Sequence, residues 1–507
     1  MPQSLRFESF RFEPATGRLW RDDREVRLTL KAAAVLGVLV AHAGEPVSKE
    51  ALFAEVWKDT VVSDDSLISC IQELRKALGD DPKTPRYIET RHRRGYRFIP
   101  PVEASSPDHG GRPNIAVLQF ENTSGDRAKD YLADAITQEI ITTLSKHRTL
   151  LVIARGPSSA FKGRREDVSS VGASLGADFI VQGSVSAQER RVRIRVQLIE
   201  IQTGEYVWAD QYDRELNDIL QLQEEITSTI ASRIEPEVGS AERSRAARKS
   251  ESALRAWDLY HLGMRHFYKS SAPDNLEAQR YFRRAINFDP TLAQAYAWLS
   301  YAEVLEMIYF DAHPDEKRLD DAIATARKAI ELDDRDAMTH FTCGRALLAR
   351  KDYEGAIAEL HSAVELNPNM AAGYCGLADS LAYEGRFAEA IPYFEKAIQL
   401  SPHDPQRWAY YSYRSLAHLF AGEFDLAVDW AQKAIRVPNS HYWPMAHRVS
   451  ALGSLQRSPD LSGAVAELLQ RKPEFTCSFA RERLFYIKNP EHLDSYVSGL
   501  RSAGIRE

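Results

Sequence analysis

The chain has 507 residues, of which 44% are hydrophobic and 27% are charged. This length predicts about three to five domains, at roughly 100–200 residues each, and the composition excludes an intrinsically disordered chain. The formal net charge of −7 excludes a global basic field that would attract nucleic acid or an anionic membrane, so a nucleic-acid site would have to be a local patch.

The four cysteines are far apart in the chain and never in CxxC spacing. This pattern predicts neither a disulfide scaffold nor a cysteine-based zinc site, and it fits a reducing compartment. The first residues lack an apolar signal core, and the longest apolar stretch, residues 32–43, is shorter than the roughly 20 residues of a membrane helix. We therefore expect a soluble, cytoplasmic protein with no membrane contact.

Residues 1–103 have the pattern of a small domain that mixes strands and helices. The expected strands cover residues 5–12, 19–21 and 25–28, and the expected helices cover residues 31–42, 48–57 and 64–78. Ser48 is the expected N-cap of the second helix. A Gly-Asp-Asp-Pro turn then precedes a hairpin formed by residues 87–90 and 96–100.

The third expected helix, residues 64–78, has two distinct faces. Leu67, Ile71, Leu74 and Leu78 recur at three- and four-residue spacing, so they predict one buried stripe. A polar face opposite such a stripe suits the DNA major groove, which admits one helix and is read by hydrogen-bonding side chains. The polar residues of this face and its flanks are Asp65, Ser66, Ser69, Gln72, Glu73 and Lys76.

The hairpin between Arg86 and Arg97 contains five arginines and one glutamate. A basic tip alone would fit a solvated hairpin on an ordinary small domain. Together with the order of the helices, it favours contact with DNA phosphates.

Residues 5–100 resemble the winged-helix domain of OmpR-type transcription regulators, particularly the CadC/ToxR-like branch. The matching segments are residues 62–67, 74–80, 88–90 and 95–98, with Ile71. The resemblance implies that the third helix enters the major groove and that the wing, residues 91–95, reaches an adjacent minor groove. This wing is more basic than the family's usual Arg-Gly-x-Gly. The expected DNA-contacting residues are Asp65, Ser66, Ser69, Gln72, Glu73, Arg75, Lys76, Thr90, Arg91, His92, Arg93, Arg94 and Tyr96.

Two departures from this family bear on regulation. From these residues we expect no phosphoreceiver domain before the winged helix and no membrane span after it. We therefore expect control to reach the winged helix through residues 113–507 or through the amount of protein made.

A Ser-, Pro- and Gly-containing linker is expected at residues 104–113, before a small α/β domain at residues 114–236. The expected strands are residues 115–120, 150–153, 178–185, 191–198 and 206–212, and the expected helices are residues 127–146, 167–175 and 216–234. Residues 113–234 resemble the TolB-type amino-terminal domain, on phrases such as Leu175-Gly176-Ala177-Asp178 and Gln182-Gly183-Ser184-Val185. That resemblance implies no catalytic activity. A basic connector is expected at residues 237–251.

One motif could indicate catalysis. Gly172-Ala173-Ser174-Leu175-Gly176 fits the GxSxG nucleophile elbow, which needs a strand before the serine and a helix after it. The expected order here is reversed, with a helix before Ser174 and a strand after it. A serine hydrolase centred on Ser174 is therefore the weaker alternative, and we expect neither an enzyme nor a cofactor or metal site.

Two arginine-rich segments have both a functional and an ordinary interpretation. Arg191, Arg193 and Arg195 share one side of an expected strand and could bind an anion or DNA, but a solvated sheet face is favoured. The basic run at residues 243–249 is expected to be a solvated helical connector.

Histidines and aromatic residues of the second half could bind a ligand or simply pack in the fold. His261 and His266 are five residues apart, which is wrong for joint metal ligation from a helix, so packing or surface positions are favoured. The aromatic residues between 408 and 413 could line a peptide groove, but aromatic residues in a repeat helix are more often core.

The second half contains an internal repeat with small residues at fixed positions. One sequence motif recurs, and it consists of a small residue, a bulky residue, Ala, an aliphatic residue and often Pro. Two of the steps between successive copies are 34 residues, which is the tetratricopeptide period. Small residues allow paired helices to touch closely, and Pro ends a helix because it lacks an amide proton. Residues 252–438 thus resemble a tetratricopeptide array, with residues 439–507 as a degenerate repeat and cap. The central alanines are Ala285, Ala329, Ala363, Ala397 and Ala434.

The sequence therefore predicts a multidomain α+β chain with a winged helix-turn-helix, a small α/β domain and an all-α tetratricopeptide solenoid. We expect a one-component transcription regulator that binds double-stranded DNA through the winged helix. RNA polymerase or another protein would bind through the loop at residues 58–63 or the repeats, which could also join two copies of the chain. The alternative is a tetratricopeptide scaffold or co-chaperone whose winged helix makes protein contacts.

Overall fold

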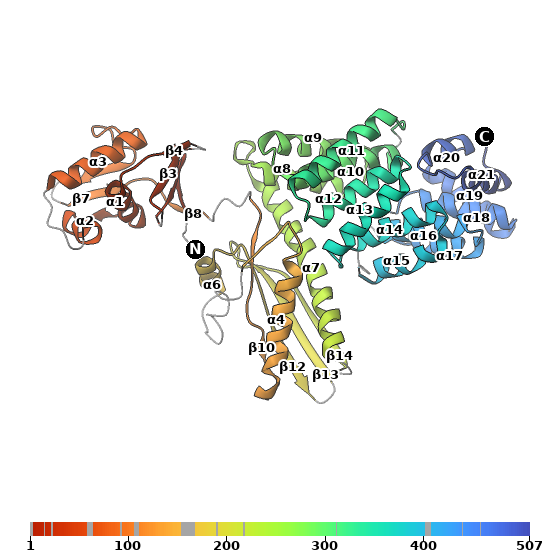
Figure 1. Ribbon diagram of the computed structural model, residues 1–507, viewed down its shortest axis with the longest axis horizontal. Coiled ribbons are helices and arrows are strands. Elements are labelled where there is room, and N and C mark those ends of the chain that lie inside the picture. Colours follow the sequence, from red (N-terminus) through yellow and green to blue (C-terminus); the bar gives the residue numbers. More distant parts are fainter. Residues whose placement is uncertain are drawn as a thin grey trace. The chain divides into compact units, whose positions relative to one another are not determined.

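The computed structural model describes residues 4–14, 16–21, 24–57, 64–91, 94–105, 111–153, 168–188, 191–215, 219–310, 312–400, 407–438, 440–456 and 458–507. The chain divides into two compact units, Met1–His109 and Gly110–Glu507 (Figure 1). The predicted architecture is confirmed: a winged-helix region is followed by a mixed-sheet domain and a helical solenoid.

The first unit contains an antiparallel sheet with the strand order β4-β3-β2-β1-β8. The prediction of one strand over residues 5–12 is wrong, because the chain reverses at Glu8 (φ 49°) and pairs Leu5 with Phe12. The reversal stacks the rings of Phe7 and Phe10 at a centroid distance of 5.7 Å. The strands are β1 (Ser4–Phe7), β2 (Phe10–Glu13), β3 (Arg18–Arg21), β4 (Arg24–Val26) and β8 (Glu103–Ser105).

Three helices and a small second sheet complete this unit. Ser48 caps α2 as predicted, since its hydroxyl accepts from the Ala51 amide at 3.1 Å. The second sheet has the order β5-β7-β6, and β6 and β7 form the wing hairpin. The elements are α1 (Leu30–Ala41), β5 (Pro46–Val47), α2 (Lys49–Val56), α3 (Asp64–Leu78), β6 (Ile88–Arg91) and β7 (Gly95–Phe98).

The middle domain is built on a sheet with the order β11-β9-β12-β13-β14, and β10 also pairs with β12. Two helices, α4 and α7, bury one face of this sheet, and α6 packs on the other. The strict alternation of β13 fits this arrangement, because Val192, Ile194, Val196 and Leu198 lie in the core, whereas the arginines between them are exposed. The elements are β9 (Asn114–Val117), β10 (Glu121–Asn122), α4 (Asp130–Leu144), β11 (Leu151–Val152), α6 (Val168–Leu175), β12 (Phe179–Gln188), β13 (Arg191–Glu200), β14 (Tyr206–Glu215) and α7 (Ile219–Arg248).

Helix α7 continues through Pro236, so the expected boundary between residues 236 and 237 falls inside one helix. Proline usually ends a helix because it cannot donate the backbone hydrogen bond. Here the second half of α7 has tertiary partners of its own: Val238 lies in the sheet core, and Arg245 pairs with Glu200 at 2.7 Å. The segment after residue 236 is therefore helix that packs through Val238 and Arg245, while Arg248 and Lys249 at its end are exposed, as expected for a solvated helical connector.

The rest of the second unit is an array of antiparallel helix pairs (Figure 1). The central alanines at 285, 329, 363, 397 and 434 are all 0% exposed, as the repeat pattern predicts. Gly263 also marks a close approach, because an added Cβ would lie 2.5 Å from Phe282. The paired helices are α8 (Ala256–Phe267), α9 (Ala272–Phe288), α10 (Ala293–Tyr309), α11 (Glu316–Leu332), α12 (Ala337–Ala349), α13 (Tyr353–Leu366), α14 (Ala371–Glu384), α15 (Phe387–Leu400), α16 (Arg407–Phe420) and α17 (Phe424–Ile435).

Four further helices form the C-terminal end of the array. Gly453 and Gly499 bring α18 and α21 so close that neither position has room for a Cβ. In the described part of the chain, no helix is long and apolar enough to cross a membrane. The helices are α18 (Trp443–Leu455), α19 (Ser458–Arg471), α20 (Cys477–Arg483) and α21 (Pro490–Ser502).

Candidate nucleic-acid interface

Helix α3 has the two faces that its sequence predicts. Leu67, Ile71, Leu74 and Leu78 are at most 2% exposed and pack into the core of the first unit. Because that stripe faces inward, the opposite face must be solvated. The exposed polar residues on this face are Asp65, Ser69, Gln72 and Lys76, with half-buried Ser66 beside them.

One flank of this face is held by α1. The Glu73 carboxylate accepts from the Thr29 amide at 2.7 Å and from the Thr29 hydroxyl at 2.8 Å. Thr29 is the N-cap of α1, where a carboxylate is favoured by the free amides and the helix dipole. Glu73 therefore fixes α3 against α1, a contact across 44 residues that the local pattern does not reveal.

The other flank is held by the wing. Arg75 Nη2 donates to the Ile88 carbonyl at 3.0 Å and to the Thr90 hydroxyl at 2.9 Å. Both partners lie on or at the start of β6, so Arg75 couples the orientation of α3 to that of the wing. The polar face of α3 is thus bounded on both sides by contacts that set its position.

The wing turns tightly at Gly95. Its φ is 94°, and an added Cβ would collide with the Val47 carbonyl oxygen, so this position requires glycine. Tyr96, an expected DNA contact, is only 7% exposed and belongs to the core. His92 and Arg93, also expected contacts, lie outside the described residues.

The arginines of the wing hairpin are largely paired within the domain. Arg91 Nε lies 3.0 Å and Arg97 Nε 2.9 Å from the same Glu89 carboxylate oxygen. Arg94 is exposed and has no carboxylate partner among the residues that the structure describes. The wing therefore presents less free positive charge than its sequence suggests, and Arg94 is its most available described cation.

The base of the hairpin is fixed by a buried carboxylate. Asp80 accepts from the amides of Arg86, Tyr87 and Ile88 at 2.6, 3.0 and 2.9 Å. The Tyr87 hydroxyl donates to Glu8 at 2.5 Å, and burial together with this carboxylate raises the pKa of Tyr87 to about 12. The N-terminal sheet, the end of α3 and the wing are therefore tied together.

Ser174 does not lie on a nucleophile elbow. It lies inside α6, and its hydroxyl donates to the Val171 carbonyl at 2.8 Å, the usual bond of a serine to its own helix. Gly176 follows the helix with a φ of 65°. The geometry that a GxSxG hydrolase requires is absent at this described site.

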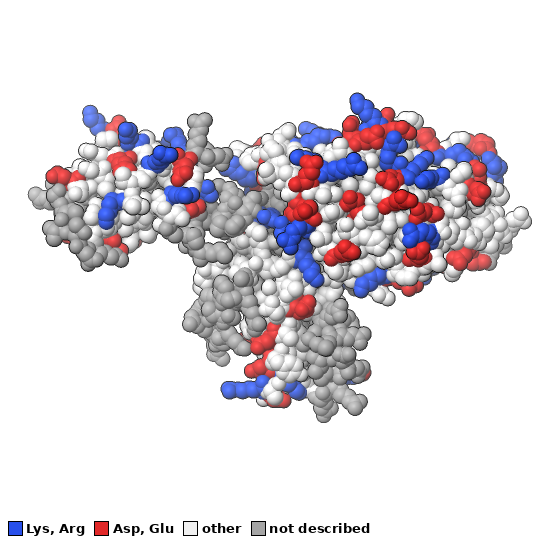
Figure 2. Space-filling view, viewed as in Figure 1, with Lys and Arg blue, Asp and Glu red and all other residues white. Residues whose placement is uncertain are grey.

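The arginines of β13 lie on a solvated face of the sheet, which is the interpretation that the sequence favoured. Arg193 Nε lies 2.7 Å from Asp213, and Arg195 Nε donates to Gln211 at 3.1 Å, both across to β14. On the face shown in Figure 2, acidic and basic side chains are also interspersed over the repeat helices. The described repeat helices on this face therefore show no continuous basic surface.

The two histidines of α8 occupy different environments. His261 is 5% exposed beside the Trp257 ring, and burial lowers the pKa of His261 to about 3. His266 Nδ1 instead lies 2.8 Å from Asp274. Among the described residues, no group of three or more His, Cys, Asp or Glu side chains could hold a metal ion.

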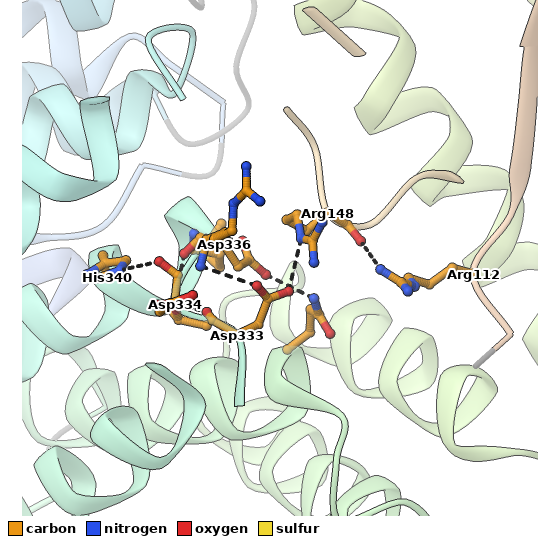
Figure 3. Close-up of polar contacts among 10 residues, drawn as sticks. Arg112, Arg148, Asp333, Asp334, Asp336 and His340 are labelled. Atoms are coloured by element: carbon orange, nitrogen blue, oxygen red, sulfur yellow. Dashed lines mark hydrogen bonds and ion pairs between the residues drawn. The ribbon is translucent and has the colours of Figure 1, made fainter. Parts of the chain in front are cut away.

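The middle domain contacts the edge of the repeat array through polar groups (Figure 3). Arg148 Nε lies 3.0 Å from Asp333 in the loop between α11 and α12, and Arg112 Nη1 donates to the Arg148 carbonyl at 3.1 Å. Farther along the same edge, the Ser228 hydroxyl donates to Asn369 at 2.5 Å. Together with Ala246 of α7, which lies in the core of the first repeat helices, these contacts join the middle domain to the array.

The loop that receives Arg148 is itself well ordered by hydrogen bonds (Figure 3). Asp336 caps α12 and accepts from Gln294 at 2.9 Å, and its burial raises the pKa of the Asp336 carboxyl. His340 Nδ1 lies 2.7 Å from Glu359, and its Nε2 lies 2.9 Å from the Asp334 carbonyl.

A cavity of about 1330 Å³ lies between the middle domain and the first helices of the repeat pairs. Trp408 and Tyr410 line it and are each 6% exposed, and Tyr413 lines it as well. Tyr411 packs beside the Trp430 ring at 5.6 Å. The aromatic cluster is thus mostly core, while part of it faces a cavity, and a peptide as its occupant stays a prediction.

Comparison with known proteins identifies two families within the chain. Residues 23–98 match the family described as "Transcriptional regulatory protein, C terminal". Residues 310–371, 341–405 and 375–441 match "Tetratricopeptide repeat". These matches confirm the winged-helix and repeat predictions, whereas the resemblance of residues 113–234 to a TolB-type domain stays a prediction.

Two curated relatives and one solved structure illustrate the similarity. The transcriptional regulator HilA of Salmonella typhimurium is 43% identical over 108 residues, 21% of this chain and 19% of HilA. A Rhizobium meliloti protein with the provisional name adenylate cyclase 3 is 36% identical over 254 residues, 50% of this chain and 43% of that protein. The DNA-binding domain of Escherichia coli CadC is 30% identical, with a TM-score of 0.19, over 21% of this chain and 98% of that chain. The matched part of this chain thus spans less than half of either curated relative.

Proposed function

Because residues 23–98 belong to the winged-helix domain family of OmpR-type transcription regulators, we propose that this protein is a one-component, sequence-specific transcription regulator acting on double-stranded DNA in the cytoplasm. The observation that carries the proposal is the exposed polar face of α3. Contacts of Glu73 and Arg75 on its two flanks fix it to α1 and to the wing. A helix held in this way can enter the major groove without losing further conformational freedom.

Two sets of side chains have different roles at the DNA: one reads the bases and the other contacts the backbone. Asp65, Ser66, Ser69, Gln72 and Lys76 face the base edges, which carry the sequence information. Thr90, Arg91 and Arg94, with His92 and Arg93, contact phosphates or the minor groove and position the domain. Glu73, Arg75 and Tyr96 act indirectly, because their side chains are occupied in holding α3 and the wing.

The repeat helices of the second unit bind a protein partner. Tetratricopeptide repeats present an extended surface made of many similar helices, which suits RNA polymerase, another protein or a second copy of this chain. The loop at residues 58–63, a second candidate for the polymerase contact, lies outside the described residues. A fragment of residues 1–103 should then bind the same DNA sequence as the full chain, more weakly and without cooperativity.

We infer that the chain acts by binding and not by catalysis. The name of the Rhizobium relative refers to a protein of which this chain matches 43%, so its activity does not transfer to these residues. Ser174 is engaged with its own helix. The remaining alternative is a scaffold whose winged helix binds protein, and it differs from DNA binding in its dependence on salt.

Fluorescence anisotropy with the full chain and labelled duplexes between 50 and 200 mM salt tests the proposal. Affinity should fall steeply with salt, because phosphate contacts release counterions. Arg94→Ala should weaken binding to all sequences and reduce the slope by about 1, whereas Arg191→Ala, a matched change on exposed β13, should leave both unchanged. Gln72→Ala should alter the preferred sequence. Binding that shows no salt dependence or no response to Arg94→Ala and Gln72→Ala would favour the scaffold.

A further inference from the structure

Helix α3 carries one exposed aliphatic side chain that belongs neither to its buried stripe nor to its polar residues. Ile68 is 39% exposed, whereas the other large apolar residues of α3 are buried in the domain core. Among the described residues of the first unit, only Leu30 is another large apolar side chain with comparable or greater exposure. The exposure of Ile68 is therefore a local feature of the surface that we propose faces DNA.

The position of Ile68 relative to its neighbours follows from the helix. Residues four apart lie one turn apart on the same side of a helix, so Ile68 and Gln72 are neighbours on this surface. Arg75, which lies seven residues after Ile68, is also on this side and holds Thr90 of the wing. Ile68 therefore lies on the wing side of the polar face, one turn before Gln72.

The DNA major groove offers one kind of apolar partner. Every base pair there presents hydrogen-bond donors or acceptors, and thymine alone among the four bases adds a C5-methyl group. Isoleucine is branched at Cβ and has few rotamers in a helix, so its methyl groups are held in a defined place. Glutamine at this surface suits adenine, which it can bind through N6 and N7.

We propose that Ile68 is a specificity-determining residue that contacts the C5-methyl group of a thymine. That thymine lies next to the base pair that Gln72 reads. The inference rests on the proposed function, since it assigns a role to one more residue of the same interface. It also narrows the ligand, because the bound sequence must contain a thymine whose methyl group, and not only its hydrogen-bonding groups, contributes to affinity.

Replacing thymine by deoxyuridine isolates this contact, because uracil lacks only the methyl group. A duplex is first selected from a random library with the full chain, and each thymine is then replaced in turn. The unaltered chain should lose about fourfold in affinity at one thymine, as expected for one methyl group removed from a buried contact. Ile68→Ala should bind the thymine and uracil duplexes equally at that position, and Ile68→Val should retain part of the difference.

Leu30→Ala is the matched control, since it removes another exposed aliphatic side chain from the same domain and should keep the methyl dependence. Uracil substitutions that never change affinity, or a methyl dependence that persists in Ile68→Ala, would overturn the assignment of Ile68 while DNA binding stands. Failure to select any duplex would instead overturn the proposed function itself, so the two failures are distinguishable.

Discussion

Replacing Glu89 by glutamine tests the charge balance of the wing. One Glu89 carboxylate oxygen lies 3.0 Å from Arg91 Nε and 2.9 Å from Arg97 Nε, so a single acid partly neutralises two guanidinium groups. Glutamine keeps the shape of the side chain and removes its charge. We expect tighter DNA binding, because both arginines become more available and one repulsive charge near the phosphates is gone.

The magnitude follows from where the pairs lie. The side chains of Glu89 and Arg91 are 25% and 46% exposed, and an ion pair near the surface contributes about 0–1 kcal/mol to the free energy of unfolding. The domain should therefore stay folded. A carboxylate about 7 Å from a phosphate is repelled by roughly 0.6 kcal/mol in water and by more near protein, so affinity should rise by roughly three- to tenfold.

The assay is anisotropy with one selected duplex over a range of salt concentrations. Glu25→Gln is the matched control, because Glu25 pairs with Arg18 at 3.8 Å in the β3–β4 hairpin and the net charge changes equally. Glu89→Gln should bind more tightly than this control, with a salt dependence at least as steep. Equal affinity for the two variants would mean that Glu89 and its arginine partners do not approach the phosphates.

Three further predictions concern the second unit. Ala363→Leu should lower the free energy of unfolding of the repeats by roughly 1–3 kcal/mol, because Ala363 is 0% exposed, whereas Ala358→Leu on the exposed side of α13 should change it little in a thermal melt. Arg148→Ala and Asp333→Asn should each destabilise docking of the middle domain, with a coupling of about 1 kcal/mol or less in a double-mutant cycle. His340→Gln should remove a pH-dependent part of repeat stability, because the hydrogen bond to its glutamate partner raises the pKa of His340. That part is present below the unfolded pKa of about 6.5 and is lost as pH rises through the higher folded value, so melts across this range should differ.

Each of these three has a contradicting result. Equal melting temperatures for the two alanine variants would mean that the buried positions of the repeat helices are assigned wrongly. Additive effects in the double-mutant cycle would show that the arginine and aspartate side chains do not interact. A melting curve of the histidine variant with unchanged pH dependence would mean that its ion pair contributes nothing to stability.

Local patterning predicted the recognition helix well, because its signal lies within the helix. The four apolar residues from Leu67 to Leu78 define the buried side by spacing alone, and this fixes which residues are exposed. The pattern could not show that Glu73 binds Thr29 or that Glu89 lies between two arginines. The first contact joins segments 44 residues apart, and the second depends on the register of the wing hairpin, in which Glu89 lies opposite Arg97. Glu73 and Arg91, two expected charges of the interface, are therefore already engaged within the domain.

Two errors in the predicted fold arise because contacts with distant residues determine the local structure. The alternation that begins at Leu5 breaks at Glu8 and Ser9 and resumes at Phe10, but no glycine or asparagine marks that turn. Glu8 is instead held by Arg86 and Tyr87, far along the chain. Helix α7 likewise passes its proline because tertiary contacts on both sides outweigh the local preference.

Selection of bound sequences from a random duplex library tests the central claim most directly. The full chain and its Ser69→Ala and Gln72→Ala variants are compared at one salt concentration. The account predicts one shared motif in which each variant loses preference at one or two adjacent positions while the flanking positions are unchanged. Absence of any enriched motif, or identical motifs for all three proteins, would contradict the claim that α3 reads the sequence of DNA.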